Sequence, residues 1–269
     1  MKRIIIYSIL IFSALFAKAQ ADSAIRFLRT INGDIVDFAV DNLDNLYLFS
    51  SSNQLKKLNM HGDSVAVYND IKKYGRATYI DVSNPLRVLL YYKDFSTIVT
   101  LDRLLNIRSV IDLRKNNILQ VKAIGLSYDN NIWLYDEVNS KLKKIDEQGK
   151  TLLETPDFRQ LFGDAPSPQS IFDRDGYVYM YDSIKGVYVF DYYGALKNKI
   201  LITGWKDFKV AGKYIYGITN DTLQRYQINT FRVDNQKLTS PVWPAFSLGF
   251  TPTRLYALKK DTVEIYSLH

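Results

Sequence analysis

Six apolar segments recur along the sequence at intervals of 37 to 46 residues, and this periodicity restricts the possible folds more than any other feature. Each segment has an apolar anchor followed by a large side chain, which is aromatic in five of the six cases. The 3.6-residue apolar period of a helical solenoid is not found inside these units. Intervals of this length therefore predict a non-helical repeat architecture. The six pairs are Leu46-Tyr47, Val88-Leu89, Ile132-Trp133, Val178-Tyr179, Ile215-Tyr216 and Leu255-Tyr256.

Within each repeat the pattern is that of short strands joined by turns. A second apolar run ends 11 to 13 residues after each anchor, as at 55–58 and 187–190. Several of these runs lead into turns in which Asp or Asn is followed by Gly, such as 146–149 and 191–194. Asp and Asn open such turns by bonding their own backbone, and Gly supplies a positive φ. Four short strands in each unit are the pattern of a propeller blade.

The repeats therefore predict an all-β chain that folds as a six-bladed β-propeller. The sixth unit ends after three strands, whereas residues 24–31, ahead of the first unit, have the pattern of one further strand. If this N-terminal strand joins the C-terminal blade, it closes the ring and hides both sheet edges. The predicted units are 36–68, 77–113, 121–155, 168–202, 206–237 and 245–268.

The segment at 40–48, with Asp41 and Asn45 before Leu46, resembles the NHL repeat of six-bladed propellers, and 128–134 repeats the pattern. The resemblance covers the chain after its first 19 residues and implies the fold. The second and fifth units depart from it, because they lack the Asp-x-x-Gly turn. The short form with an export signal also resembles envelope propellers that serve as accessory subunits of outer-membrane machines, such as the plug of the type IX secretion translocon.

The first 19 residues have the pattern of a cleaved secretory signal. Lys2 and Arg3 precede a short apolar run from 4 to 16, and the small-x-small sequence at 17–19 fits a cleavage site. The sequence thus predicts a signal peptide at 1–19 and one propeller domain at 20–269. The apolar run is shorter than the roughly 20 residues of a spanning helix, and a retained N-terminal anchor is the alternative. We expect an exported protein, in the periplasm or peripheral to the outer membrane.

Charge and cysteine content exclude several classes of function. The chain has no Cys, which excludes disulfides, thiolate nucleophiles, Cys-ligated zinc and a lipoprotein anchor. Removal of the signal peptide takes Lys2, Arg3 and Lys18 with it and lowers the formal net charge from +7 to +4. The remaining Lys and Arg are scattered among Asp and Glu. This scatter is typical of a solvated surface, and we expect no nucleic-acid partner.

The sequence offers few residues for catalysis. Of its two histidines, His61 lies in a predicted glycine turn and His269 is the last residue of the sequence. The serine-nucleophile motif G-x-S-x-G, the phosphate loop G-x-x-x-x-G-K and the dinucleotide motif G-x-G-x-x-G are all absent. We therefore expect no cofactor, and the sequence favours a non-enzymatic role.

Carboxylates on the predicted innermost strands give the alternative. Propeller hydrolases and lyases resembling this fold often hold calcium in the central channel through Asp, Asn or Glu. Asp37, Asp81 and Asp207 would supply such a site here. Lys122 on another inner strand would compete for the same space, and Asp37 or Asp81 would equally serve to bond the backbone of a neighbouring blade.

A partner is expected on the face that carries the connections between blades, because these loops vary without disturbing the sheets. The longest connection, 154–168, contains a predicted helical turn that begins after Pro156 and ends at Gly163. Its apolar side chains would bind a partner or cover neighbouring blades as a lid. The candidate binding residues are Arg76, Arg114, Phe158, Leu161, Phe162, Trp205 and Trp243.

Two functions of different classes follow from these observations. The first is a protein-interaction module of the envelope that binds an outer-membrane protein or a secretion component. The second is a calcium-dependent hydrolase or lyase for small molecules with its site in the channel. Carbohydrate binding by surface Tyr and Trp is a third reading, since the chain has 20 Tyr.

Overall fold

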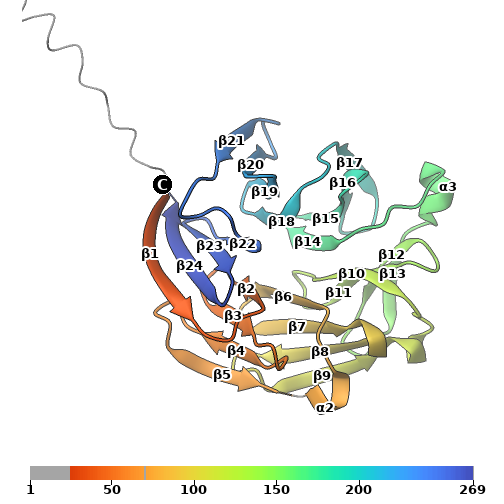
Figure 1. Cartoon of the computed structure of the whole chain (residues 1–269). Helices are drawn as coiled ribbons and strands as arrows, with labels where there is room; N and C mark the ends of the chain where they lie inside the picture. The colour runs from red at the N-terminus through yellow and green to blue at the C-terminus, as the bar shows by residue number, and fades with distance from the viewer. Residues whose placement is uncertain (1–24, 70, 269) are drawn as a thin grey trace, which may run out of the picture.

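Six four-stranded antiparallel sheets form a ring in the computed structural model, which describes residues 25–69 and 71–268 (Figure 1). The predicted signal peptide lies outside these residues. Five sheets are meanders of four consecutive strands, and they form the first five blades. The first blade has β2 (Asp37–Val40), β3 (Leu46–Phe49), β4 (Leu55–Leu58) and β5 (Ser64–Tyr68), the second has β6 (Tyr79–Asn84), β7 (Arg87–Tyr92), β8 (Thr97–Asp102) and β9 (Ile107–Asp112), and the third has β10 (Val121–Leu126), β11 (Ile132–Asp136), β12 (Lys141–Ile145) and β13 (Thr151–Glu154). The fourth has β14 (Ser170–Arg174), β15 (Tyr177–Asp182), β16 (Gly186–Asp191) and β17 (Leu196–Ile200), and the fifth has β18 (Lys206–Ala211), β19 (Tyr214–Thr219), β20 (Thr222–Gln227) and β21 (Val233–Lys237).

The sixth sheet joins the two ends of the described chain. It consists of β22 (Ser247–Phe250), β23 (Arg254–Lys259), β24 (Thr262–Leu268) and β1 (Ile25–Asn32). Strand β1 runs antiparallel to β24, with Ile25 opposite Leu268 and Asn32 opposite Thr262. The predicted six-bladed fold and its closure by an N-terminal strand are therefore confirmed.

Within residues 25–69 and 71–268, four short helical segments lie outside the sheets: α2 (Ile71–Tyr74), α3 (Phe158–Phe162) and the 3₁₀ turns η2 (Lys93–Phe95) and η3 (Leu113–Asn116). The predicted helical turn in the longest connection is α3. Asp157 caps its first turn by accepting a hydrogen bond from the Arg159 amide, and Gly163 follows its last residue. In the described part of the chain no helix is long and apolar enough to cross a membrane.

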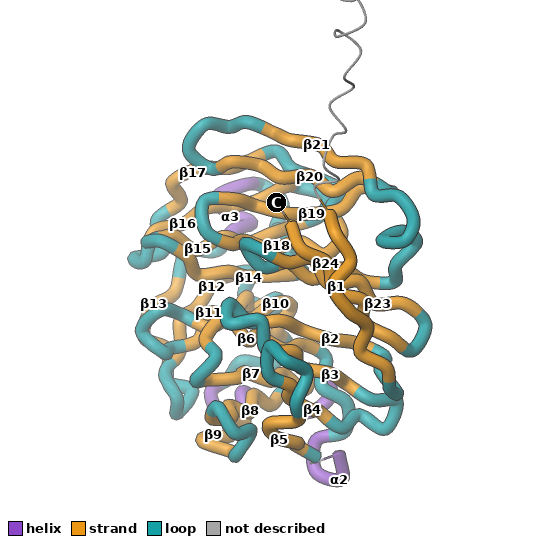
Figure 2. The backbone as a smooth tube through the Cα atoms, turned by 90° about the vertical axis from the view of Figure 1, so that its left-hand side faces the viewer, coloured by secondary structure: helices purple, strands orange, loops and turns teal. Residues whose placement is uncertain are grey.

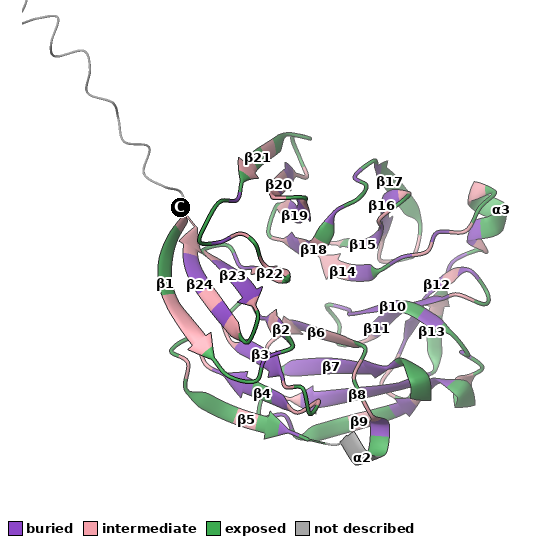
Figure 3. Ribbon diagram, in the orientation of Figure 1, coloured by how far each residue is buried: buried purple, intermediate pink, exposed green. Residues whose placement is uncertain are grey.

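The core consists of apolar layers between neighbouring blades. All six anchors and the large side chains that follow them are buried, because they lie on the second strand of each sheet. The outermost strands β5, β13, β17 and β21 carry mostly exposed residues (Figure 3). Blades three and four pack especially closely at Gly125, where a Cβ atom would lie 2.4 Å from the Ile171 carbonyl oxygen.

The turns between third and fourth strands share one hydrogen-bond pattern in the first four blades. In the third blade, Asp146 Oδ1 accepts from the amides of Gln148 and Lys150, and Gly149 has a φ of +86°. The second blade lacks this glycine, yet Asp102 makes the equivalent bonds and Leu105 adopts a φ of +61°. The departure from the sequence pattern thus preserves the turn and places a non-glycine residue in left-handed backbone.

The meander gives the ring two faces of different construction, which Figure 2 shows from the side. All blade-to-blade connections, and the turns between second and third strands, lie at one end of the strands; we call this the connection face. The turns between first and second strands and between third and fourth strands lie at the other end, the turn face. The innermost strands β2, β6, β10, β14, β18 and β22 run from the connection face to the turn face around the channel.

Candidate functional site

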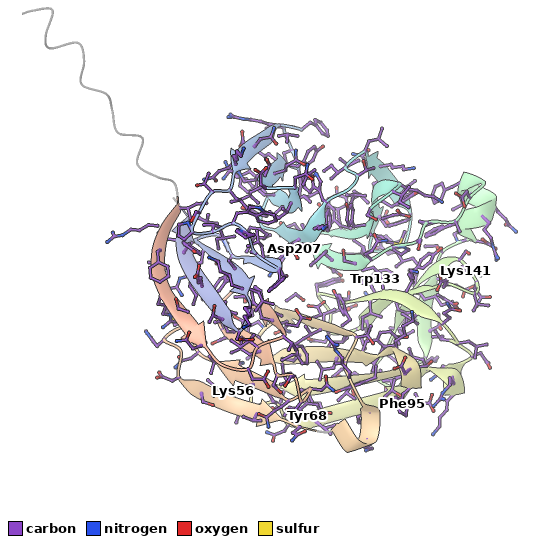
Figure 4. The ribbon with its side chains drawn as sticks, in the orientation of Figure 1. Lys56, Tyr68, Phe95, Trp133, Lys141 and Asp207 are labelled. Atoms are coloured by element: carbon purple, nitrogen blue, oxygen red, sulfur yellow. The ribbon has the colours of Figure 1, made fainter. Side chains whose placement is uncertain are left out.

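The central channel contains a cavity of about 310 Å³ whose wall is built from five of the six innermost strands. Residues of β2, β6, β14, β18 and β22 line it, and the three predicted carboxylate candidates lie on three of these strands. Asp81 and Asp207 line the cavity itself. Figure 4 shows Asp207 near the centre of the ring. The channel is therefore the place to test for ion or ligand chemistry.

Asp207 connects the fifth blade to the sixth. Its Oδ1 accepts from the Ser247 hydroxyl and its Oδ2 from the Leu248 amide, both at 2.9 Å. The residue lies at a bulge of β18 with a φ of +50°, which turns its side chain toward β22. Burial raises the pKa of Asp207, the two hydrogen bonds lower it, and the nearby charge of Asp37 raises it further.

Asp81 performs the same role between the second and third blades. It also lies at a strand bulge, and its carboxylate accepts from the amides of Ser83 at 2.7 Å and Leu126 at 2.8 Å. Asp37, at the start of β2, accepts a hydrogen bond from the Phe38 amide. Burial raises the pKa of Asp37, whereas that bond and the charge of Arg76 lower it.

The three aspartates do not converge. Among the residues that the structure describes, no group of three or more His, Cys, Asp or Glu side chains is placed to hold a metal ion. The oxygens of Asp81 and Asp207 accept bonds from backbone amides of adjoining blades. This role was the expected structural alternative for Asp81 but was not expected for Asp207. The expected competition from Lys122 is wrong: this residue lies outside the cavity wall, and its ammonium group lies 3.7 Å from Glu137.

The cations that do line the channel were missed by the sequence analysis. They are Lys209 on β18 and Arg174 at the end of β14. Side chains two residues apart on a regular strand share a face, so the sequence pattern puts Lys209 on the same face as Asp207. That alternation was the signal that could have found it.

We expect Asp207→Asn to stabilise the domain more at pH 7 than at pH 4. When the pKa of a carboxyl group is higher in the folded than in the unfolded protein, the folded state loses stability as the pH rises from the unfolded-state pKa through the folded-state pKa. Asparagine is neutral throughout and keeps one acceptor for Leu248 and one polar group for Ser247. Thermal unfolding of both proteins from pH 4 to 7 measures the difference. The exposed Asp261→Asn variant is the control, and a difference that does not change with pH would contradict the assignment.

The seven candidates on the connection face divide by burial. Phe158 is 0% exposed and stacks between Tyr135 and Phe190, so it belongs to the core as the lid alternative proposed. Trp205 is 7% exposed, with its backbone amide donating to the Tyr181 hydroxyl. Neither ring offers surface to a partner as it is placed.

The other five candidates retain accessible surface. Phe162 and Trp243 are half-buried: Phe162 packs on Phe158, and Trp243 packs on the core of the sixth blade. Leu161 is exposed on α3. Arg76 and Arg114 are exposed, and Arg114 pairs with Asp112 at 3.1 Å.

The three most exposed apolar side chains on this face were also missed; Leu119, Val138 and Phe95 are less exposed ones on the same face. Ile184 lies in the turn between β15 and β16, Leu201 in the connection to β18, and Phe246 in the connection to β22. They are 81%, 81% and 78% exposed, respectively, and they come from loops of consecutive blades. We call these three residues the apolar arc. The sequence does not reveal that these residues are exposed, because an apolar residue in a loop can be either covered or exposed and the sequence pattern is the same in both cases.

The comparison with known proteins shows a similarity in fold only. The sequence matches no described protein family and no curated protein. Among solved structures it is similar to a streptogramin B lyase, with 16% identity over 87% of this chain and 79% of the other and a TM-score of 0.59. A catalytically inactive His-to-Ala variant of virginiamycin B lyase from Staphylococcus aureus, with quinupristin, gives 12% identity over 90% and 99% and 0.58. BamB from Moraxella catarrhalis gives 12% over 90% and 99% and 0.55. At these identities the likeness shows the propeller fold alone.

Proposed function

We propose that the protein is a non-enzymatic interaction module of the cell envelope that binds a protein partner through its connection face. The apolar arc is the observation that carries the proposal. Three large apolar side chains with about four fifths of their surface exposed are costly to leave in water. Contiguous apolar patches mark protein contact sites, and we propose that these three side chains belong to one. Leu161 adds a further apolar group on the same face.

The envelope location rests on the sequence. The predicted signal peptide favours export, and a domain without Cys is held together by its core alone. We propose an outer-membrane protein or a secretion component as the partner, with this chain as an accessory or plug subunit.

The channel supports the enzymatic alternative less well. The donor groups do not fit a calcium site, because Asp81 and Asp207 already accept backbone bonds and two cations share the cavity. The lyase named above is inactive when a histidine is replaced by alanine. Here the one histidine within 25–69 and 71–268 is His61, in an exposed turn between β4 and β5.

The test is co-purification of the tagged chain from its native host under mild detergent. We expect a stoichiometric complex, measured by light scattering, that the triple variant Ile184→Ser/Leu201→Ser/Phe246→Ser no longer forms. Truncating a central interface side chain costs about 1–2 kcal/mol, so three together should weaken binding roughly 100-fold or more.

The matched control carries the same change on the turn face, at the exposed residues Leu86, Tyr193 and Phe231. This Leu86→Ser/Tyr193→Ser/Phe231→Ser variant should bind as the unmodified chain does. If only the control variant lost the complex, the partner would bind the turn face and not the connection face. A monomeric chain with no stoichiometric partner would overturn the proposal.

A further inference from the structure

The turn-face end of the channel brings two cations together inside the cavity. Arg174 is the last residue of β14, and Lys209 lies near the end of the neighbouring inner strand β18. Their charges are close enough for Arg174 to disfavour protonation of Lys209. Both residues line the cavity of about 310 Å³.

Lys209 reaches across the channel. Its ammonium group donates to the carbonyl oxygen of Val40 at 3.0 Å, which joins the fifth blade to the first across the position of the sixth. An ammonium group has three donors, and this bond uses one of them. Burial lowers the pKa of Lys209 to about 8, against the opposing attraction of Asp81 and Asp41. At neutral pH the group is still mostly protonated.

Among the residues that the structure describes, the Arg174 guanidinium group makes no hydrogen bond or ion pair, and its Nε is buried without an acceptor. Buried polar groups of native proteins are nearly always paired, and an unpaired one calls for an explanation. A ligand whose oxygen atom accepts a hydrogen bond from Arg174 at this position supplies that explanation.

The neighbouring carboxylates already have donors. Asp41 accepts from the amides of Leu43 and Asn45, from the Asn45 side chain and from the Tyr47 hydroxyl. Asp81 accepts two amides, as described above. The two cations therefore have unused donors in the cavity, since Lys209 uses one of its three and Arg174 uses none among the described residues. Because two negative charges stand nearby, the site suits a ligand with one negative charge better than a dianion.

The rest of the cavity wall is largely apolar. Phe172 and Phe208 lie against each other with ring centroids 5.9 Å apart, and Val82 and Phe250 face the same space. A cavity of this size with apolar walls and a few convergent polar groups is typical of small-ligand sites. An aliphatic or aromatic body fits these walls, and an anionic head fits the cationic end.

We propose that the channel binds a small organic carboxylate, with its carboxylate between Lys209 and Arg174 and its apolar body against Phe172 and Phe208. This site is separate from the proposed protein interface, which lies on the other face. Each charged hydrogen bond contributes enough that its removal should weaken binding at least tenfold.

Calorimetric titration of the chain lacking 1–19 with hexanoate tests the proposal. Hexanoate should bind, while hexanol, of similar shape without the charge, and inorganic phosphate should bind at least tenfold more weakly. Lys209→Met and Arg174→Gln should each lower hexanoate affinity at least tenfold. The same-strand control Lys206→Met, at an exposed position, should leave it unchanged.

The pH dependence gives a second readout on the unmodified protein. The charged groups facing Lys209 are Asp81 from β6, Asp41 after β2 and Arg174 from β14. Bound carboxylate favours protonated Lys209, so affinity should fall about tenfold per pH unit above pH 8 and binding at pH 8.5 should take up protons. Absence of hexanoate binding, equal binding of hexanol, or a pH-independent affinity would each overturn the proposal, even where a variant fails to fold.

Discussion

Replacing Gly217 with alanine is expected to destabilise the domain by about 3 kcal/mol, the upper end of the usual cost of overpacking. A Cβ atom there would lie 2.3 Å from the Trp205 ring and 2.7 Å from the Trp205 Cβ. Trp205 cannot move aside easily, because the Tyr181 hydroxyl accepts from its amide and donates to its carbonyl oxygen. Denaturant unfolding measures the change in free energy of unfolding.

A double-mutant cycle separates this collision from a backbone effect. Trp205→Ala alone should cost about 3–5 kcal/mol through the cavity that it leaves. Adding Gly217→Ala to that variant should cost little, because the methyl group then enters empty space. Gly33→Ala, whose Cβ meets only Ile35 at 3.8 Å, is the matched control and should change stability by less than about 0.5 kcal/mol. Strictly additive losses at 205 and 217 would contradict the packing account.

The same contact decides how Trp205 variants are interpreted in binding experiments. Trp205 lies in a blade connection, where sequence reasoning made it an interface candidate. Its substitution will reduce partner binding by unfolding the connection around Tyr181, whatever the partner contacts. The exposed residues Ile184, Leu201 and Phe246 carry no such structural load and give the cleaner test.

The fold could be predicted from the sequence because the same residue pattern occurs in every repeat and can be recognised by its regular spacing. Each anchor pair had to be buried for two adjoining sheets to pack, so Leu46 and Leu255 mark the same position in different blades. The closing strand could be predicted because the last unit of the sequence lacks its fourth strand, while a segment ahead of the first unit has the pattern of a strand. Even the missing glycine of the second blade did not mislead, because Leu105 takes the left-handed backbone in its place.

The site could be predicted less well, because its geometry depends on how blades meet. Both Asp81 and Asp207 were expected as ligands, and only Asp81 was also expected to bond a neighbouring blade. Strand bulges that the sequence does not reveal aim both side chains at the next blade. Lys209 was overlooked although its alternation with Asp207 placed it in the channel. Phe158 and Leu161 lie three residues apart on α3, and the packing of α3 on the blades decides which one is exposed.

Removing β1 is expected to have the other large effect, since this strand alone closes the ring. Without residues 25–32, β24 becomes a sheet edge with unpaired amide and carbonyl groups, which favours aggregation. The side chain of Ile31 would also leave the core between the sixth and first blades. We expect the truncated chain to be largely insoluble, or to melt far below the full-length domain, by fractionation and thermal unfolding.

A circular permutant shows whether pairing or chain order provides this closure. Ile25 and Leu268 are opposite each other in the register, so a two-residue Asn-Gly turn can join them as a hairpin, with the new N-terminus at Gly33. All four strands of the sixth blade then become one meander like the other five. The permutant should recover the full-length stability within about 1 kcal/mol, because every pairing of the ring is retained. If the permutant failed while the truncated chain folded normally, β1 would be an accessory strand, and the ring would have to be stabilised without it.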